Sequence, residues 1–225
     1  GTNEEILNGN IIATSRLLES ILNEGKPSAR MVFASSAQTY SLANCKTPIR
    51  ETKKATPDTV YGVSKQNAEN LIKISGIPYT ILRLTNVYGP GCRPNYNSVI
   101  ATLCYRAIKG LPLLINGDGR QGRDFVYIDD VVQAFTLAGF INVPGSGKIY
   151  NISSGRMVAI KQIVKLICRN YKNTKAEFLM DNKQSEISYC CDPSRFSEKY
   201  GWRPRVSLSK GIEQTLSYYG RKKKK

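Results

Sequence analysis

The stretch Arg30-Met31-Val32-Phe33-Ala34-Ser35-Ser36 is a short apolar run that ends in small hydroxyl residues. Such a run is typical of a buried parallel strand that delivers side chains to a site at its carboxyl end. Apolar residues recur at helical spacing over residues 4–23 before it, and residues 60–74 after it predict a second helix. The stretch therefore predicts a parallel strand between two helices.

The same alternation continues along the chain. The further strands that we expect span 79–84, 113–115, 125–128 and 148–152, and the further helices span 97–109, 129–140, 159–170 and 208–219. Gly89-Pro90-Gly91 and Asn116-Gly117-Asp118-Gly119 predict turns between them. Strand–helix alternation of this kind predicts an α/β fold with a largely parallel sheet.

The composition excludes several classes of function. The 225 residues contain no histidine, which removes serine–histidine and cysteine–histidine catalysis and histidine-ligated metals. No apolar run reaches the roughly 18–20 residues of a membrane span, and the first residues lack the pattern of a secretory signal. We therefore expect a cytoplasmic protein without a metal, and no membrane partner. The six cysteines form no Cys-x-x-Cys and are predicted to be free thiols.

The formal net charge of +16 is partly a terminal effect, because residues 221–225 are all basic. A terminal run of this kind is usually a solvated tail. The remaining excess, densest over 148–183, leaves nucleic-acid binding as one hypothesis. We do not favour it, because no nucleic-acid motif or interleaved aromatic residue accompanies the charge.

One pattern carries acid/base chemistry. Tyr61 and Lys65 stand at i and i+4, on one face of the helix predicted over 60–74. A cation beside a phenol favours the phenolate and lowers a pKa that is ordinarily about 10, so that the phenolate can accept a hydroxyl proton. Other tyrosines, among them Tyr105 with Lys109, have a lysine at the same spacing. What distinguishes Tyr61 is that the strands ending at Ser36 and Leu84 flank it, and a crevice at strand ends is where an α/β sheet binds its ligand.

The chain resembles the extended short-chain dehydrogenase/reductases, and among them the NAD-dependent sugar-nucleotide epimerase/dehydratase branch. The motifs that carry the resemblance follow one another in the family's order. They are Asn10-Ile11-Ile12-Ala13-Thr14, Ser36, Tyr61-x-x-x-Lys65, Arg83-x-x-Asn86-Val87-Tyr88-Gly89-Pro90, Gly117-Asp118-Gly119-x-x-x-Arg123-Asp124-Phe125-Val126-Tyr127-Ile128-Asp129-Asp130-Val131, Tyr150-Asn151-Ile152-Ser153 and Gly201-Trp202-Arg203-Pro204. The similarity thus covers nearly the whole chain.

The resemblance implies the role of each candidate residue. Tyr61 would be the acid/base, Lys65 would lower its pKa, and Ser36 would bind the reacting hydroxyl. The implied contacts with NAD are Asn10, Ser35, Tyr61, Lys65, Thr85 and Val87, and the implied contacts with a nucleotide-diphosphate sugar are Ser36, Asn86 and Arg123. For Arg123 an ion pair with Asp124, Asp129 or Asp130 is the alternative.

The resemblance also implies a division of the chain. Residues 1–90 would be part of a doubly wound, Rossmann-like NAD domain, with a return near 113–152. Residues 91–220 would form a smaller α/β substrate lobe, followed by the basic tail 221–225. A homodimer would form through helices 4–23 and 60–74. The function implied is epimerisation at the sugar C4 through a keto intermediate, for polysaccharide biosynthesis.

The chain departs from the family's pattern at several positions. No Gly-x-Gly-x-x-Gly or Gly-x-x-Gly-x-x-Gly occurs in it, so we expect a chain that lacks the first βαβ units and the pyrophosphate loop. A catalytically dead remnant that acts as a binding or scaffold protein is therefore the alternative. Ser36-Ala37-Gln38 stands where the 4,6-dehydratases have Thr-Asp-Glu, which favours epimerisation over dehydration. Asn182 stands where the family often has a second arginine for the diphosphate.

Overall fold

The computed structural model describes residues 2–25, 30–43, 45–96, 98–141, 147–171, 174–180 and 187–222. The chain divides into two compact units and passes between them several times. Unit 1 comprises Gly1–Thr85, Gln133–Ile152 and Cys191–Trp202, and unit 2 comprises Asn86–Val132, Ser153–Cys190 and Arg203–Lys225. After residue 85, the chain thus returns to unit 1 at residues 133–152 and 191–202. The assignment of NAD and of the sugar nucleotide to separate parts of the chain stays a prediction.

Unit 1 is built on a parallel sheet. Strands β1 (Met31–Ser36), β2 (Tyr79–Leu84) and β7 (Lys148–Ile152) lie in the order β1-β2-β7. The register pairs Ser36 with Leu84, and Leu84 with Ile152, so the carboxyl ends of the strands meet at one edge. The predicted parallel strand at the stretch of residues 30–36 is confirmed, and its serines lie at that edge.

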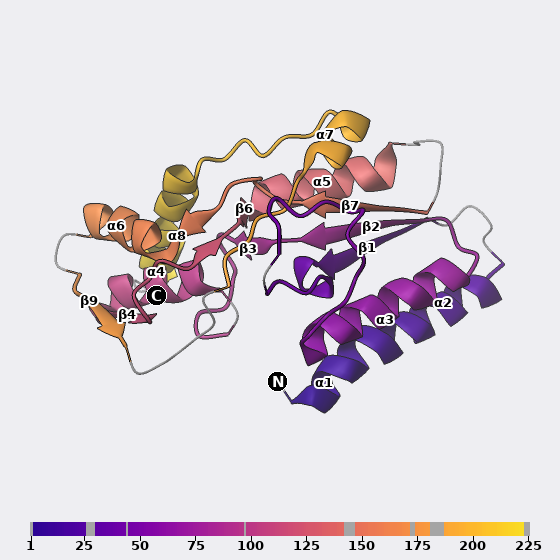
Figure 1. Cartoon of the computed structure of the whole chain (residues 1–225), viewed down its shortest axis with the longest axis horizontal. Helices are drawn as coiled ribbons and strands as arrows, with labels where there is room; N and C mark the ends of the chain where they lie inside the picture. The colour runs from indigo at the N-terminus through magenta and orange to yellow at the C-terminus, as the bar shows by residue number, and fades with distance from the viewer. Residues whose placement is uncertain are drawn as a thin grey trace. The chain divides into compact units, whose positions relative to one another are not determined.

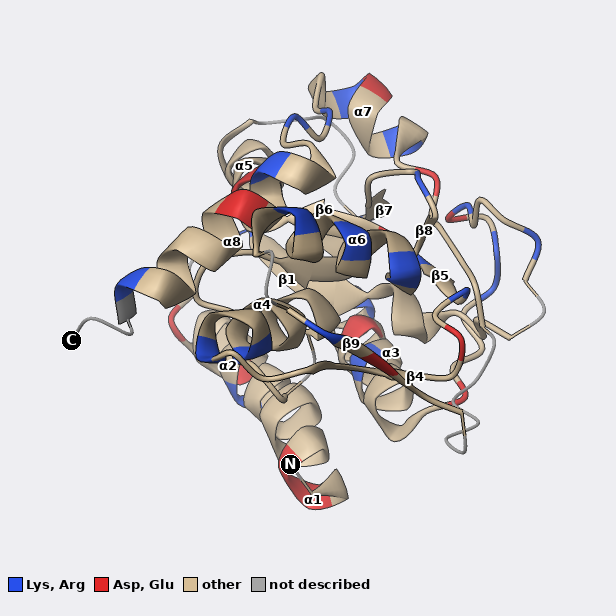
Figure 2. Ribbon diagram, turned by 90° about the vertical axis from the view of Figure 1, so that its left-hand side faces the viewer, with Lys and Arg blue, Asp and Glu red and all other residues tan. Residues whose placement is uncertain are grey.

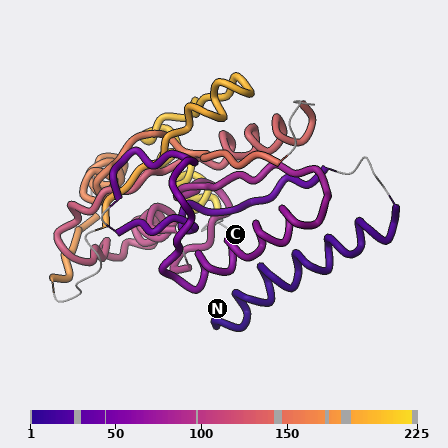
Figure 3. The backbone as a smooth tube through the Cα atoms, turned by 45° about the vertical axis from the view of Figure 1, so that its right-hand side comes forward, coloured from indigo at the N-terminus to yellow at the C-terminus, as the bar shows by residue number. Residues whose placement is uncertain are grey.

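Helices cover both faces of this sheet. The first helix of the chain consists of α1 (Asn3–Leu7), a π-helical segment (Asn8–Ile12) and α2 (Ala13–Asn23), and it packs against α3 (Val60–Ile74). Figure 1 shows α2 and α3 side by side below β1 and β2, and the later part of α5 (Ile128–Phe140) on the other face. The tube in Figure 3 shows the same layering from another side.

Caps explain where the helices of unit 1 begin. Thr2 forms a capping box with Glu5 at the start of α1. The hydroxyl of Thr59 accepts a hydrogen bond from the N–H of Gly62 at 3.0 Å, so α3 begins at Val60 as predicted. The short helix α7 (Ser194–Tyr200) completes unit 1 by packing Phe196 against Tyr150 of β7.

Unit 2 holds short strand pairs and a helical core. Strands β3 (Asn86–Tyr88) and β6 (Phe125–Tyr127) are parallel, as are β4 (Leu113–Asn116) and β9 (Ala176–Leu179), whereas β5 (Gly122–Arg123) and β8 (Val158–Ala159) are antiparallel. Helices α4 (Val99–Lys109), α6 (Ile160–Asn170) and α8 (Leu208–Lys222) pack against one another. Their apolar sides form one core that contains Leu103, Ile163 and Ile212.

One close approach in unit 2 requires a glycine. A Cβ atom at Gly211 of α8 would lie 2.3 Å from the hydroxyl oxygen of Tyr88 on β3. No side chain fits in that space, so the glycine fixes how closely α8 packs against the β3–β6 pair.

Three basic residues of unit 2 lie along one side of helix α6. Lys161, Lys165 and Arg169 of α6 are exposed, and Figure 2 shows the positive charge along this helix. Their spacing of four residues, opposite the buried Ile163 and Ile167, is that of the solvated face of an amphipathic helix. In the described part of the chain, no helix is long and apolar enough to cross a membrane.

The helices and strands that were predicted are present, with small shifts at their ends. Helix α4 begins at Val99 with Ser98 as its cap, and residue 97, where it was expected to begin, lies outside the described residues. Helix α8 runs to Lys222, so the predicted tail 221–225 starts within a helix, and residues 223–225 lie outside the described residues. Elements β3, β5, β8, β9 and α7 are short and were not predicted.

Candidate active site

The amine of Lys65 lies against the ring of Tyr61. Its Nζ is 5.8 Å from the centroid of the Tyr61 ring and 5.1 Å from that of Phe33 on β1. Nζ also donates a hydrogen bond to the carbonyl oxygen of Ala34 at 3.0 Å, which anchors the amine to β1. Burial lowers the pKa of Lys65 below its usual value of 10.5. The i, i+4 prediction is thus confirmed as a real contact that holds a cation at the phenol ring.

Ser36 begins a turn that packs against the first turn of α3. The N–H of Gln38 donates to the hydroxyl of Ser36 at 3.1 Å, and the hydroxyl of Thr39 donates to the Ser36 carbonyl at 2.9 Å. A Cβ at Gly62 would lie 2.2 Å from the Gln38 carbonyl oxygen. This turn therefore packs directly on α3 next to Tyr61, and only a glycine at position 62 allows that approach.

The first helix of the chain contacts the same part of α3. The Asn10 amide donates to the hydroxyl of the buried Ser64 at 3.0 Å, and Ser64 donates to the Tyr61 carbonyl at 2.8 Å. Asn10 lies in the π-helical segment, and such turns are often found at functional sites. Asn10 therefore supports the backbone of Tyr61, and its predicted contact with NAD stays a prediction.

The other predicted cofactor residues are held by hydrogen bonds within their own units. The hydroxyl of Ser35 donates to Glu69 at 2.6 Å, and the N–H of Thr85 donates to the Ile152 carbonyl at 3.1 Å. Val87 lies in unit 2, in register with Val126 of β6. A contact between NAD and any of these residues stays a prediction.

A buried charged pair beside these residues was not predicted from the sequence. Glu69 of α3 accepts two hydrogen bonds from Arg83 of β2, at 2.9 Å and 2.6 Å. The guanidinium carbon of Arg83 lies 4.6 Å from the centroid of the Tyr40 ring. The sequence gives no signal for this pairing, because the two residues lie on different elements, α3 and β2.

The predicted substrate residues of unit 2 lie around Tyr189. The Asn86 amide donates to the Tyr189 hydroxyl at 3.0 Å and to the Asp124 carbonyl at 2.9 Å. The guanidinium carbon of Arg123 lies 5.8 Å from the centroid of the Tyr189 ring. Burial lowers the pKa of Arg123, as expected of a partly desolvated cation. The structure therefore groups Asn86 with Arg123, and it adds Tyr189, for which the sequence gives no signal.

The structure bears on the alternative role of Arg123. The carboxylate of Asp124 accepts hydrogen bonds from the N–H and the hydroxyl of Ser154, and that of Asp130 accepts from the N–H groups of Arg205 and Val206. Within the described ranges, no ion pair of Arg123 with a carboxylate is present. The alternative, an ion pair with Asp124, Asp129 or Asp130, is therefore absent there. Asn182 lies outside the described residues.

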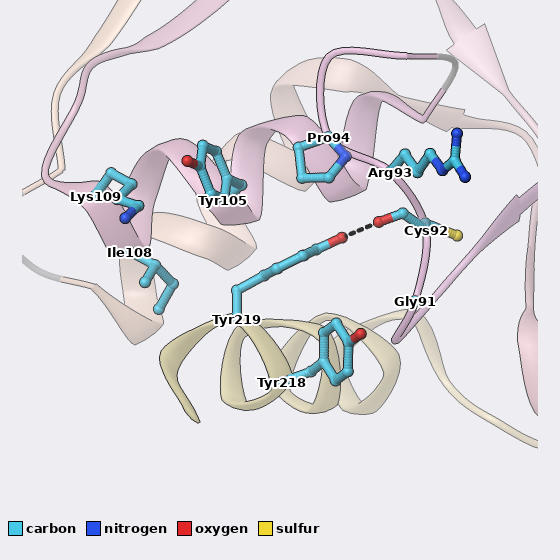
Figure 4. A pocket seen from close by; sticks show the side chains of 9 residues that line it. All are labelled: Gly91, Cys92, Arg93, Pro94, Tyr105, Ile108, Lys109, Tyr218 and Tyr219. Carbon is cyan, nitrogen blue, oxygen red and sulfur yellow. Dashed lines mark hydrogen bonds between the residues drawn. The ribbon is translucent and has the colours of Figure 1, made fainter. Parts of the chain in front are cut away.

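A cavity of about 350 Å³ lies apart from these residues within unit 2. Tyr105 and Ile108 of α4 and Tyr219 of α8 line it, together with the loop at Gly91 and Pro94, as Figure 4 shows. The Tyr219 hydroxyl donates to the Cys92 carbonyl across one end. None of the predicted site residues lines it.

Each of the six cysteines is a free thiol, as predicted.

Comparison with known proteins identifies the family. The family model described as "NAD dependent epimerase/dehydratase family" matches residues 1–153. The chain therefore belongs to the NAD-dependent epimerase/dehydratase family of enzymes, and the predicted family and cofactor are confirmed.

Among curated relatives, a putative UDP-glucose 4-epimerase of Methanocaldococcus jannaschii is 30% identical over 93% of this chain and 68% of its own length. A UDP-glucuronate 4-epimerase of Thermodesulfobacterium geofontis is 30% identical over 94% of this chain and 65% of its own. A dTDP-glucose 4,6-dehydratase of Haemophilus influenzae is 27% identical over 93% and 68%. The chain thus spans about two thirds of the length of these relatives.

Solved structures confirm the α/β fold. The UDP-glucose 4-epimerase of Thermotoga maritima, crystallised with UDP-glucose, has a TM-score of 0.84 at 30% identity, covering 97% of this chain and 71% of that one. The UDP-glucuronic acid 4-epimerase of Bacillus cereus, in complex with UDP-glucuronic acid and NAD, has a TM-score of 0.83 at 28% identity, covering 94% and 67%.

The residues of unit 1 fit one end of an NAD molecule. An ammonium group has three N–H donors, and the contact with Ala34 uses one of those of Lys65, so donors remain for ribose hydroxyls. The 225 residues contain no glycine-rich turn for the pyrophosphate. Donors of Lys65 therefore remain for a ribose of NAD, and the part of NAD that they would contact stays a prediction.

Proposed function

We propose that the chain acts as a sugar-nucleotide 4-epimerase that uses NAD and a transient 4-keto sugar. The observation that carries the proposal is the Lys65 amine, which is anchored to the Ala34 carbonyl and lies against the ring of Tyr61. The names of the relatives, which include UDP-glucose and UDP-glucuronate 4-epimerases, support a uridine-diphosphate sugar as substrate. Two proton transfers by Tyr61 and a binding role for Arg123 follow from this arrangement.

The first step is proton transfer at the sugar. Tyr61 as phenolate would accept the proton of the 4-hydroxyl, and the ammonium of Lys65 would stabilise the phenolate. The hydroxyl of Ser36 would donate a hydrogen bond to the reacting oxygen, since it accepts one from Gln38 and retains its own proton. NAD, when bound, supplies the group that accepts the hydride from the sugar C4 and from which the hydride returns to C4 of the keto sugar.

The remaining roles are the return of the proton to the sugar oxygen and the binding of the diphosphate. Once the sugar has turned, the same Tyr61 would return its proton to the oxygen, so a single group serves as base and then as acid. Arg123 would pair with the diphosphate, because a partly desolvated guanidinium gains most from a phosphate group, and Asn86 would add an amide donor.

The residues next to Ser36 favour epimerisation over loss of water. Ala37 is buried, and Gln38 accepts a hydrogen bond from the Thr59 hydroxyl at 3.3 Å. Neither side chain carries the carboxyl group that would protonate a leaving hydroxyl or remove a proton at C5. Because a 4,6-dehydratase is among the relatives, the product has to be identified in the test.

The test is turnover of UDP-glucose and of UDP-glucuronic acid with NAD present, with the products separated by chromatography. We expect the 4-epimer of one of these sugars, and Tyr61→Phe should abolish it. Tyr105→Phe is the matched control, because Lys109 lies 5.6 Å from the centroid of its ring, and it should keep full activity. A dehydrated product would show a dehydratase. No turnover and no binding of NAD would favour the scaffold alternative.

We also propose a homodimer in the cytoplasm, serving polysaccharide biosynthesis. Apolar side chains on the helix formed by α1, the π-helical segment and α2 are exposed. Their exposure supports a dimer interface that this helix forms together with α3 against the same helices of a second copy. The exposed side chains are Leu7, Ile12, Leu17 and Leu22. Sedimentation analysis of the wild type should give a dimer and that of Leu17→Glu a monomer, and a monomeric wild type would contradict the interface.

A further inference from the structure

Unit 1 contains a polar network that joins all of its candidate catalytic elements. Glu69 lies on α3, Ser35 on β1 and Arg83 on β2, and they are 0%, 3% and 3% exposed. The Ser35 hydroxyl and the Arg83 Nε both donate to the same oxygen of Glu69, at 2.6 Å and 2.9 Å, and Arg83 Nη2 donates to the other oxygen at 2.6 Å. The carboxylate of one helix thus holds two neighbouring strands.

The network extends beyond this carboxylate. Tyr40, in the chain after the Ser36 turn, lies with its ring 4.6 Å from the guanidinium carbon of Arg83 and donates its hydroxyl to Asn151 of β7 at 3.0 Å. Burial raises the pKa of Tyr40 to about 12, so its hydroxyl remains a donor at neutral pH. Each strand of the sheet is therefore tied to the network by at least one directional contact.

Stability alone does not account for a buried charged pair. Apolar residues of similar volume are often as stabilising as a buried ion pair, because the pair must first be desolvated. A bidentate guanidinium–carboxylate pair differs from apolar packing in that it fixes both distance and orientation. The feature that this pair adds to unit 1 is a defined position of α3 relative to β1 and β2.

The position of Glu69 connects this geometry to the candidate site. Glu69 is one helical turn beyond Lys65, and Ser35 directly precedes Ser36. The amine of Lys65 reaches the carbonyl of Ala34, also on β1, at 3.0 Å. A shift of α3 along β1 would therefore move Lys65, Tyr61 and Ser36 relative to one another.

We propose that Glu69 is a positioning residue which, through Ser35 and Arg83, holds α3 in register with β1 so that Lys65 stays against Tyr61. The inference rests on the proposed function for its effect on turnover. A displacement of about 1 Å in a catalytic group can cost about 100-fold in rate. Loss of the network should therefore lower kcat strongly while the KM for the sugar nucleotide, whose diphosphate contacts lie in unit 2, changes little.

The test removes both charges together, so that no buried charge is left unpaired. In Glu69→Leu/Arg83→Met, circular dichroism and thermal unfolding should report a folded protein, and kcat should fall about 100-fold at nearly constant KM. Lys210→Met/Glu213→Leu is the matched control, because it removes an exposed pair with a separation of 3.1 Å on α8. A folded Glu69→Leu/Arg83→Met variant with wild-type kcat would overturn the proposal.

A second readout does not require turnover. In protein labelled with 3-fluorotyrosine, the fluorine signal of Tyr61 is assigned by its loss in Tyr61→Phe, and Lys65→Met shows where the signal moves when the amine is removed. We expect the signal of Tyr61 in Glu69→Leu/Arg83→Met to move toward the Lys65→Met position while that of Tyr105 stays in place. An unmoved Tyr61 signal overturns the proposal even if no variant turns over a sugar. A moved signal in a protein without activity separates the positioning role from the proposed function.

A milder variant covers the case in which the double variant does not fold. Ser35→Ala removes only the hydroxyl that donates to Glu69. It should shift the same fluorine signal in the same direction by a smaller amount and lower kcat several-fold. A folded Ser35→Ala protein with wild-type values for both would then overturn the proposal.

Discussion

Helices α3 and α4 each carry a tyrosine followed one turn later by a lysine, and the surroundings of the two pairs differ. In both, the lysine amine lies near the ring, at 5.8 Å for Lys65 with Tyr61 and 5.6 Å for Lys109 with Tyr105. Lys65 is half-buried and bonded to the strand β1 behind it, whereas Lys109 is exposed in the last turn of its helix. Tyr105 packs edge-on against Tyr219.

The comparison shows what a sequence spacing does and does not determine. An i, i+4 spacing brings a cation to a ring on any helix. A site also requires desolvation of the cation and neighbours that hold it, and α3 has both because it packs against a parallel sheet at the Ser36 turn. Replacing corresponding residues in the two regions should therefore give unequal effects.

The largest difference is expected for the lysines. Lys65→Met should lower kcat by about 10²–10⁴-fold, because the phenolate of Tyr61 loses its cation. Lys109→Met should leave kcat unchanged. Steady-state kinetics of both variants with whichever of UDP-glucose and UDP-glucuronic acid the wild type turns over measures the ratio, and equal losses would show that the two pairs are equivalent.

The next difference concerns one glycine in each region, Gly62 on α3 and Gly220 on α8, which packs against α4. Gly62→Ala places a Cβ 2.2 Å from the Gln38 carbonyl oxygen, so the Ser36 turn must move away from α3 at a cost of about 1–3 kcal/mol in unfolding free energy. At Gly220 of α8 a Cβ would lie 3.7 Å from Ile108, an ordinary contact, and alanine should stabilise that helix by about 0.5–1 kcal/mol. Urea denaturation compares the two, and similar signs would be evidence against a tight contact at Gly62.

A smaller difference is expected for one hydrogen bond in each region, that of Asn10 behind α3 and that of Tyr219, whose ring packs on Tyr105 of α4. Asn10→Ala removes the donor to Ser64 and should cost about 1 kcal/mol together with a few-fold loss of kcat. Tyr219→Phe removes the donor to the Cys92 carbonyl and should cost a similar amount without a loss of kcat. An Asn10→Ala variant with unchanged kcat would limit Asn10 to a structural role.

The smallest effect is a pH dependence of stability. Since burial lowers the pKa of Lys65, the unfolded chain binds this proton more tightly than the folded protein. The cost of burying the charge is complete below the folded pKa and disappears as the pH rises to the usual 10.5. As the pH rises toward 10.5, the wild type should therefore gain stability relative to Lys65→Met. The same comparison with Lys109→Met gives the background, and an equal slope would contradict the effect.

Long, strongly patterned segments of the fold could be predicted from the sequence. The helix predicted over residues 60–74, for which Asp58 or Thr59 could serve as the cap, and the apolar strand predicted over 79–84 have signals of their own, which the structure confirms within a residue. The pair β5–β8 has no such signal, because Gly122–Arg123 and Val158–Ala159 are strands only through their pairing with each other. Tertiary contact decides such elements, and periodicity cannot show it.

The candidate site likewise contains contacts that could be predicted from the sequence and contacts that could not. The Tyr61–Lys65 contact follows from helix geometry and could be predicted. The pairing of Glu69 with Arg83 requires α3 and β2 to meet at one level, which no spacing along the chain encodes. The approach of Arg123 to the ring of Tyr189 joins residues far apart in the chain, and residues 187–190 around Tyr189 form neither helix nor strand.

The late return of the chain to unit 1 has a consequence for the order of synthesis. Phe196 of α7 and Trp202 are fully buried against each other at 5.6 Å between ring centroids, and they belong to the same unit as β1. A ribosome releases these residues only after most of unit 2 has been made, so unit 1 cannot complete its core while its own first segment emerges. Because Trp202 is the only tryptophan of the chain, its fluorescence provides a built-in signal for the moment at which that core closes.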